Sequence, residues 1–280
     1  MAQIAKTILE IKNLRVSFKA KPDAGGKRFY AVDGVSLDLE EGSFTALVGE
    51  SGSGKSVTAL SVCRLLFPES LSGRVYFHSD GGKTDLLTLP EAELLRFRGR
   101  EIAYVFQDPA SSLNPVFRIG EQLEETYLAH FPAAKSEARD KAFHWLRAVK
   151  IKDPERVYRS FPHELSGGMK QRAMIAMALL SNPRVLIADE PTTALDAVTE
   201  QDVLRLLVHF QKEKRLAVLF ITHDLPLVSS FAETLYVMEK GRIVEGLRKE
   251  RGSFRPAEAY TQRLFRAQLL SSQPKETMEI

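Results

Sequence analysis

The chain has 280 residues, of which 44% are hydrophobic and 27% charged, and its formal net charge is +3. These values are ordinary for a globular protein with one large domain or two small ones. The two densest basic runs, 212–215 and 248–251, each contain a glutamate, so the charge pattern gives no reason to expect a nucleic-acid partner. Because Cys63 is the single cysteine, one chain cannot form an internal disulfide, a Cys-based zinc site or a Cys-ligated iron–sulfur cluster.

Hydropathy gives no sign of a membrane span. No uncharged apolar stretch approaches the ~18 residues that a spanning helix needs. The first residues, Met1–Lys12, lack the apolar centre of a signal peptide. If the protein acts at a membrane, we therefore expect another polypeptide to supply the bilayer crossing.

The first part of the chain is predicted to contain an antiparallel layer followed by a buried strand and a helix. Partial alternation predicts strands at Ile8–Phe18 and Ala31–Leu39, joined by a surface loop over 19–27. A continuous apolar run predicts a buried strand at Phe44–Val48, and apolar periodicity predicts a helix at Lys55–Leu66. The next predicted elements are a strand at Gly73–His78, a helix at Pro90–Phe97 and a strand at Ile102–Phe106.

From residue 116 to residue 180 the pattern changes to helices only. Apolar residues at three- and four-residue spacing predict helices at Ile119–Phe131, Ser136–Val149 and Met169–Leu180. Because this block interrupts an alternating strand–helix order, we expect a helical subdomain, 109–182, inserted into a core formed by 1–108 and 183–250. The remaining predictions are strands at Val185–Ala188, Leu216–Ile221, Thr234–Met238 and Arg242–Val244, helices at Val198–Lys214, Leu225–Phe231 and Pro256–Leu270, and a helical tail over 251–280.

The most informative pattern joins the predicted strand 44–48 to the helix that follows. Its glycines allow backbone amides to turn inward around a polyanion, and the helix start adds free N–H groups and partial positive charge. The spacing matches Gly-x4-Gly-Lys-Ser, in which the lysine reaches the β- and γ-phosphates of a nucleoside triphosphate and the serine binds Mg²⁺. The residues concerned are Gly49, Glu50, Ser51, Gly52, Ser53, Gly54, Lys55 and Ser56.

Two carboxylates, Asp189 and Glu190, end the apolar run that starts at Val185. A strand without polar interruptions is typical of a parallel sheet covered on both faces. Ligands of such sheets lie beyond the carboxyl ends of the strands. We therefore expect Asp189 to bind Mg²⁺, directly or through water, and Glu190 to orient and polarise an attacking water. The alternative is a strand that simply ends in solvated acids.

A second anion cradle is predicted in the stretch Leu165–Arg172. Ser166 is a candidate N-cap, and Gly167 and Gly168 leave backbone amides accessible at the start of an apolar helix. One nucleotide needs only one cradle of this type, so the second one requires an explanation.

These motifs resemble, in their order, those of the ATP-binding subunit of ATP-binding-cassette (ABC) transporters. The resemblance covers roughly residues 8–250. It implies an α/β fold: a P-loop NTPase (RecA-like) core with an antiparallel β layer and an inserted α-helical subdomain. The matching stretches are the phosphate loop Gly49–Ser56, the glutamine-loop residue Gln107, the signature Leu165–Gln171, the magnesium strand Val185–Glu190, the D-loop Thr192–Asp196 and the switch region Ile221–Asp224.

The resemblance also assigns roles to individual residues. Two such domains pair head to tail, so Ser166, Gly167 and Gly168 are expected to contact the γ-phosphate bound on the other subunit. His223 is expected to contact the γ-phosphate in its own subunit. Gln107 is expected to sense Mg²⁺ and the attacking water, which makes it a candidate both for catalysis and for the metal site. The family stacks an aromatic residue on adenine; here Phe18, Phe29 and Tyr30 are candidates, and we favour Tyr30.

Three further stretches are similar to the peptide/nickel branch of bacterial importers: Phe106–Pro115, Ile119–Gln122 and Ala259–Gln262. The resemblance therefore implies an ATPase that powers import of peptides, a related small solute or nickel, with ATP and Mg²⁺ as cofactors. Its implied partners are membrane permease subunits and a second ATP-binding subunit, identical or related, of which we favour the related one. An extracytoplasmic solute-binding protein would act with it indirectly.

The implied location is peripheral, at the cytoplasmic face of the cell membrane. Three alternatives stay open at this point: an ABC exporter ATPase, a soluble ABC ATPase in DNA repair or translation, and a non-catalytic nucleotide-binding regulator.

Overall fold

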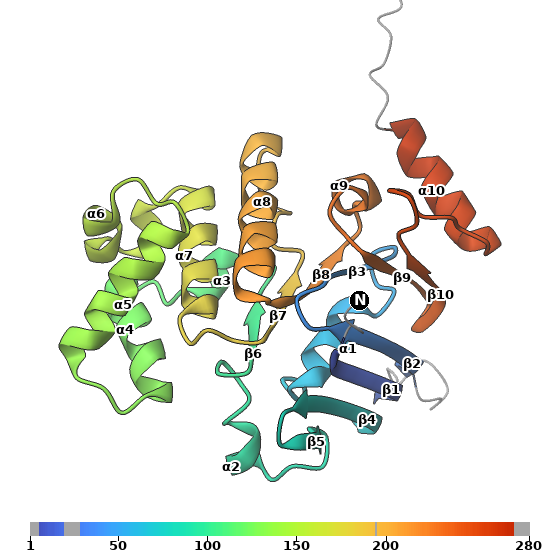
Figure 1. The fold of residues 1–280 in the computed structure, drawn as a ribbon, viewed down its shortest axis with the longest axis horizontal. Coiled ribbons are helices and arrows are strands. Elements are labelled where there is room, and N and C mark those ends of the chain that lie inside the picture. Colours follow the sequence, from blue (N-terminus) through green and yellow to red (C-terminus); the bar gives the residue numbers. More distant parts are fainter. Residues whose placement is uncertain (1–5, 20–28, 194, 272–280) are drawn as a thin grey trace, which may run out of the picture.

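The computed structural model describes residues 6–19, 29–193 and 195–271, with side chains described as far as residue 267. Its strands form two sheets, a four-stranded sheet ordered β2-β1-β4-β5 and a six-stranded sheet ordered β10-β9-β3-β8-β7-β6 (Figure 1). The loop predicted over 19–27 lies outside the described residues except for Lys19, as does Ala194 of the predicted D-loop.

The four-stranded sheet is the predicted antiparallel layer. Its central pair β1 and β4 runs antiparallel, with Ile11 opposite Val75, and β2 flanks β1 on the other side. The short strand β5 was not predicted, because none of its four residues is apolar and none is buried. The bounds are β1 (Thr7–Phe18), β2 (Phe29–Glu40), β4 (Ser70–Ser79) and β5 (Gly82–Asp85).

The six-stranded sheet is parallel from β9 through β6, and β10 closes it with an antiparallel pairing to β9. Every residue of β3, β7 and β8 is buried, which explains why these strands carry unbroken apolar runs. Their side chains alternate between two apolar cores, one on each face of the sheet. The bounds are β3 (Phe44–Val48), β6 (Ile102–Val105), β7 (Val185–Asp189), β8 (Ala217–Thr222), β9 (Thr234–Glu239) and β10 (Arg242–Arg248).

Helix α1 (Lys55–Val62) lies between the two sheets, where Ala59 and Val62 join the core that the sheets share (Figure 1). The prediction that it continues to Leu66 is wrong. The chain turns at Arg64, which has a φ of 51°, and the Arg98 guanidinium takes the carbonyls left free there, with Nε 2.8 Å from the Cys63 oxygen. The helix therefore stops one turn earlier than its apolar pattern suggested.

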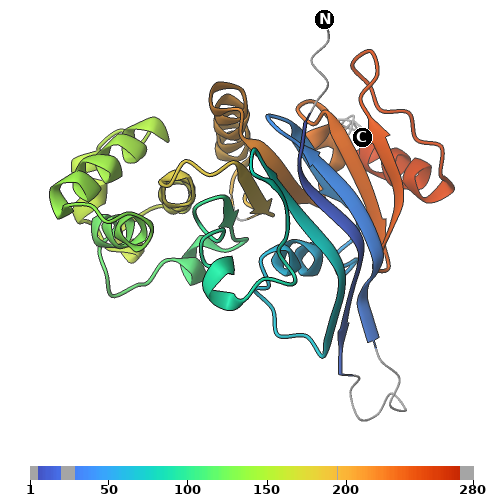
Figure 2. The ribbon, with the colours of Figure 1, turned by 60° about the horizontal axis from the view of Figure 1, so that its bottom comes forward.

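A group of helices, α3 to α7, lies to one side of the six-stranded sheet, away from the antiparallel sheet (Figures 1 and 2). It contains two short helices, α3 and α6, that were not predicted; each begins with an aspartate N-cap, Asp108 or Asp153, followed by proline. The division into a core and an inserted subdomain at 109–182 stays a prediction. The bounds are α3 (Pro109–Ser112), α4 (Ile119–His130), α5 (Lys135–Ala148), α6 (Pro154–Arg159), a 3₁₀ turn at Pro162–Glu164 and α7 (Gly167–Leu179).

The remaining helices are α2 (Glu91–Leu94), α8 (Ala197–Lys214), α9 (Leu225–Ser229) and α10 (Ala259–Ser271). In Figure 1, α10 lies beside α9 and the hairpin β9–β10. The helix predicted at 256–270 begins three residues later than expected. Within the described part of the chain, no helix has both the length and the apolar character of a membrane span.

Candidate active site

The phosphate loop follows β3 and ends in the first turn of α1, as the sequence predicts. Two of its glycines are required by close approach of the backbone. A β-carbon at Gly49 would lie 2.2 Å from the Met238 carbonyl oxygen, and one at Gly54 would lie 2.4 Å from that of Ala31. Gly54 also has a φ of 106°, which side-chain-bearing residues rarely adopt. The loop is therefore pressed against β2 and β9, and its shape is fixed before any ligand binds.

Lys55 lies inside this loop and is only 4% exposed. Its Nζ donates hydrogen bonds of 2.9 Å to the carbonyl oxygens of Gly49 and Glu50. Burial lowers the pKa of Lys55, and the nearby negative charges of Glu190 and Asp189 oppose that shift. Two main-chain carbonyl oxygens thus hold the ammonium group inside the loop, which is the position expected for a group that meets phosphate oxygens.

Asp189 ends β7 with its carboxylate buried beneath the start of α1. The Ser56 hydroxyl donates a 3.0 Å hydrogen bond to Asp189 Oδ1, and the Tyr104 hydroxyl donates a 2.7 Å hydrogen bond to Oδ2. Burial raises the pKa of Asp189, and the two hydroxyl groups lower it again. Tyr104 was missed by the sequence analysis, because a tyrosine in an apolar strand carries no signal that distinguishes it from a core residue.

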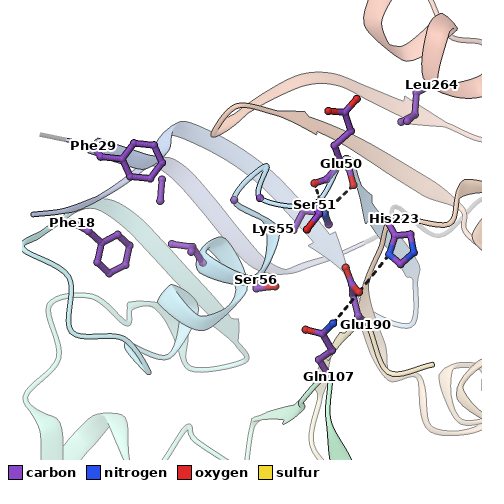
Figure 3. A pocket seen from close by; sticks show the side chains of 15 residues that line it. Phe18, Phe29, Glu50, Ser51, Lys55, Ser56, Gln107, Glu190, His223 and Leu264 are labelled. Carbon is purple, nitrogen blue, oxygen red and sulfur yellow. Dashed lines mark hydrogen bonds and ion pairs between the residues drawn. The ribbon is translucent and has the colours of Figure 1, made fainter. Parts of the chain in front are cut away.

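Glu190 is contacted by three polar side chains, two of which, Gln107 and His223, are drawn in Figure 3. Its Oε2 accepts hydrogen bonds from Gln107 Nε2 at 3.2 Å and from the Thr193 hydroxyl at 3.0 Å, and it lies 3.4 Å from His223 Nδ1. The structure thus brings together the three predicted catalytic residues, which come from the ends of three neighbouring parallel strands. Thr193 is an additional hydrogen-bond partner of Glu190. The sequence analysis assigned it to the D-loop but did not predict it as a site residue.

The phosphate loop lines one cavity of about 810 Å³ together with Gln107, Glu190 and His223. Two predicted residues of the phosphate loop and the magnesium strand do not line it: Ser53, whose buried hydroxyl lies 3.5 Å from Lys55 Nζ, and Asp189, which reaches the cavity through Ser56. Leu264 of α10 lines the cavity although no sequence pattern suggested it. The predicted site residues in the lining are Gly49, Glu50, Ser51, Gly52, Gly54, Lys55, Ser56, Gln107, Glu190 and His223.

The aromatic side of the cavity differs from the prediction. Phe18 and Phe29 line it, whereas Tyr30, the residue that the sequence analysis favoured for adenine, does not. Neighbouring residues of a strand point to opposite faces, so Phe29 and Tyr30 cannot both face the cavity. The structure therefore favours Phe18 and Phe29 as the aromatic candidates and argues against Tyr30.

The second anion cradle lies in a different cavity, of about 570 Å³, which is lined by Ser166, Gly167 and Gly168 together with Lys150 and Lys152, among others. Ser166 is the N-cap of α7, and its hydroxyl accepts a 3.4 Å hydrogen bond from the Met169 amide. None of the three signature residues lines the phosphate-loop cavity. Within one chain the two cradles are therefore separate.

Ser56 and Asp189 are suited to bind Mg²⁺ together with phosphate and water, and not to form a metal site made of protein ligands alone. In the described ranges no group of three or more His, Cys, Asp or Glu side chains could hold a metal ion. Mg²⁺ prefers oxygen ligands and is commonly bound through one or two protein groups plus substrate phosphates and water. A hydroxyl and a carboxylate 3.0 Å apart beside the phosphate loop fit that pattern.

A family model described as "ABC transporter" matches residues 32–193, which is more than half of the chain. The chain belongs to the ABC transporter family. The cassette is 46% identical over 264 residues to the peptidoglycan transport ATP-binding protein YejF of Agrobacterium fabrum, and this match covers 93% of the chain but 47% of YejF. It is 42% identical over 257 residues to the oligopeptide transport ATP-binding protein OppD of Bacillus subtilis, a match that covers 91% of the chain and 70% of OppD.

Among solved structures, the cassette resembles a dimeric post-hydrolysis state of the ATP-binding cassette MJ0796 bound to ADP and Pi. The TM-score is 0.75 at 30% identity, and the match covers 86% of the chain and 98% of MJ0796. These findings confirm the predicted fold class and the predicted ATP-binding cassette of an ABC transporter. The chain spans about half the length of YejF, the first of these relatives.

Proposed function

We propose that the cassette hydrolyses ATP to power an importer of peptides or of a related small solute. The observation that carries the hydrolytic part is the position of Glu190, held by Gln107, Thr193 and His223 at the mouth of the loop that contains Lys55. The names of the relatives support the transport part: OppD is an oligopeptide transport protein, and a Brucella melitensis relative at 43% identity is a putative peptide import protein.

The chemistry that we propose follows from these positions. The loop amides and Lys55 hold the triphosphate. The Glu190 carboxylate orients a water molecule in line with the γ-phosphate and polarises its O–H bond. Gln107 and His223 hold Glu190 and lie close enough to respond to the γ-phosphate. Ser56 and Asp189 would hold Mg²⁺, which when bound neutralises charge on the β- and γ-phosphate oxygens.

The second cradle leads us to propose a head-to-tail pair. Ser166, Gly167 and Gly168 lie outside the phosphate-loop cavity of their own chain, so a second ATP-binding subunit would have to present its ATP to them. The solved structure of MJ0796 is dimeric, which supports a pair of cassettes. The second subunit is either identical or a related chain, and we favour the related one.

We further propose membrane permease subunits as the partners that receive the energy of ATP, with a solute-binding protein acting through them. Three large apolar side chains are exposed around the start of the helical group: Phe106 at 43%, Val116 at 71% and Phe117 at 47%. Phe106 begins the stretch that resembles peptide/nickel importers, and Val116 and Phe117 directly follow it. Exposed apolar side chains of this kind suit contact with another protein. Such contacts support our proposal that the cassette acts at the cytoplasmic face of the membrane. ATP drives such a partner only through its different affinity for two arrangements of the pair.

The decisive experiment is Glu190→Gln. We expect the variant to bind ATP like the parent, to hydrolyse it at least about 100-fold more slowly, because general base catalysis contributes factors of this order, and to accumulate as an ATP-bound pair. Glu93→Gln, an exposed glutamate in α2, is the matched control. Hydrolysis by Glu190→Gln at the parental rate would show that the base is wrongly assigned.

A further inference from the structure

Helix α10 reaches the nucleotide cavity from behind the phosphate loop. Leu264 is 9% exposed and lines the cavity together with Gly49, Glu50 and His223. Figure 3 shows Leu264 on the side of Glu50, away from the aromatic end formed by Phe29. The C-terminal helix therefore forms part of the wall at the phosphate end of the cavity.

Tyr260 lies one helical turn before Leu264 and so shares its face of α10. Its hydroxyl is buried and makes no hydrogen bond of normal geometry to the described part of the chain. Burial raises the pKa of Tyr260, the negative charge of Glu50 raises it further, and the Glu50 main chain, which the hydroxyl already approaches without nucleotide, lowers it. A buried hydroxyl without a partner is costly, so it indicates a state in which it is paired.

The segment around α10 is firmly attached to its surroundings. The Glu245 carboxylate on β10 accepts hydrogen bonds from the amides of Ala257 at 2.7 Å and Glu258 at 3.2 Å, just before the helix. Lys249 Nζ donates to the carbonyl oxygens of Ser229 and Ser230 at the end of α9, at 2.7 and 3.0 Å. Contacts with β10 and with the end of α9 thus fix the position of α10 on the cassette core.

We propose that α10 belongs to the nucleotide site: Leu264 supports the phosphate loop at Glu50, and the Tyr260 hydroxyl bonds to the loop main chain there once nucleotide is bound. This inference rests on the proposed function in taking the ligand to be ATP or ADP. In the nucleotide-free chain, Lys55 holds the Gly49 and Glu50 carbonyls from inside the loop. When its ammonium turns to phosphate, α10 holds the same residues from outside. Both α10 residues are positioning residues.

The test is binding of a fluorescent ADP analogue with Mg²⁺ to the full chain without any membrane partner. For Tyr260→Phe we expect about fivefold weaker binding, as for one lost hydrogen bond, and a melting temperature without nucleotide that is equal or higher. Leu264→Ala should weaken binding by a similar factor, and Leu264→Met should restore it. With ATP, both Tyr260→Phe and Leu264→Ala should raise KM and leave kcat unchanged.

Two control variants test whether any Tyr→Phe change, or any change in α10, would weaken nucleotide binding. Tyr76→Phe makes the same chemical change in β4, and Arg266→Ala changes the exposed face of α10. If Tyr260→Phe and Leu264→Ala bind nucleotide as the parent does, or lower only the melting temperature, α10 is merely structural and the inference fails. If the parent chain itself binds no nucleotide, the proposed function fails instead.

Discussion

The Tyr104 hydroxyl on β6 donates a 2.7 Å hydrogen bond to the carboxylate of Asp189 on β7. The Tyr104 and Ser56 hydroxyls together offset part of the cost of burying the Asp189 charge next to the phosphate loop. Burial strongly raises the pKa of Tyr104, so it remains a hydrogen-bond donor throughout the working pH range. Tyr104 thus holds Asp189 in its charged form without itself reaching the cavity.

Replacing Tyr104 by phenylalanine should weaken the affinity of the site for Mg²⁺ rather than abolish activity. Without the donor, the pKa of Asp189 rises further, and its charged form becomes less available to a cation. We expect the Mg²⁺ concentration for half-maximal ATPase activity to increase about tenfold, the size of one hydrogen bond to a charged group. A titration of activity with Mg²⁺ measures this. Tyr76→Phe serves as control, and an unchanged midpoint would rule out a role for Tyr104 at the metal.

Replacing Asp189 by asparagine should stabilise the nucleotide-free chain while abolishing Mg²⁺-dependent hydrolysis. Because burial raises the folded-state pKa of Asp189 above 3.8, the folded chain binds this proton more tightly than the unfolded chain. Stability is therefore lost as pH rises from about 4 through the folded-state pKa, and the loss persists at neutral pH. The asparagine variant avoids this loss, and we expect its melting temperature at pH 7 to be about 2–4 °C higher.

The pH dependence provides the matching check on Asp189. Between pH 4 and 7 the parent should lose stability relative to Asp189→Asn, so the two melting curves should converge toward acid pH. If the variant is less stable than the parent at pH 7, the hydrogen bonds of the carboxylate outweigh its burial, and our interpretation of the site is wrong.

Replacing Lys55 by methionine should remove nucleotide binding and preserve the fold. Methionine can occupy the same buried channel, but it supplies neither the charge nor the donors that meet phosphate. We expect at least about 100-fold weaker binding of ATP, the loss of a buried charge–phosphate contact. Isothermal titration of ATP measures the change, and circular dichroism checks the fold. Lys83→Met, in the distant strand β5, should bind ATP normally.

The stack between Phe44 on β3 and Phe220 on β8 should be a large contributor to stability. The ring centroids lie 5.7 Å apart, and both side chains are fully buried. We expect Phe220→Ala to reduce the free energy of unfolding by about 3–5 kcal/mol, through lost burial and the cavity left behind. Urea denaturation without nucleotide measures it. Phe67→Ala, at a side chain that is 99% exposed, should change the free energy by less than about 0.5 kcal/mol.

The sequence predicted the parts of the site that lie in local patterns. Lys55 and Ser56 follow a glycine-rich turn, and Glu190 and His223 follow unbroken apolar strands, so their neighbours along the chain reveal them. Strands that are buried on both faces, such as β7 and β8, could be predicted for the same reason.

Other parts of the site depend on contacts between distant segments and could not be predicted. Tyr104 meets Asp189 across 85 positions of the chain. Leu264 reaches the cavity only because α10 packs beside α9 and β10. The choice of Phe29 over Tyr30 depends on which face of β2 is turned to the cavity, and an error of one residue reverses that choice.

Lys55 and Ser166 line separate cavities, so an isolated cassette at high dilution would offer ATP only half of its proposed contacts. The rate of ATP hydrolysis per molecule should then rise with protein concentration until nearly every cassette is paired with another. Anchoring two cassettes to one membrane assembly would raise their effective concentration to about the millimolar range. In that case assembly itself, and not the level of ATP, switches the enzyme on.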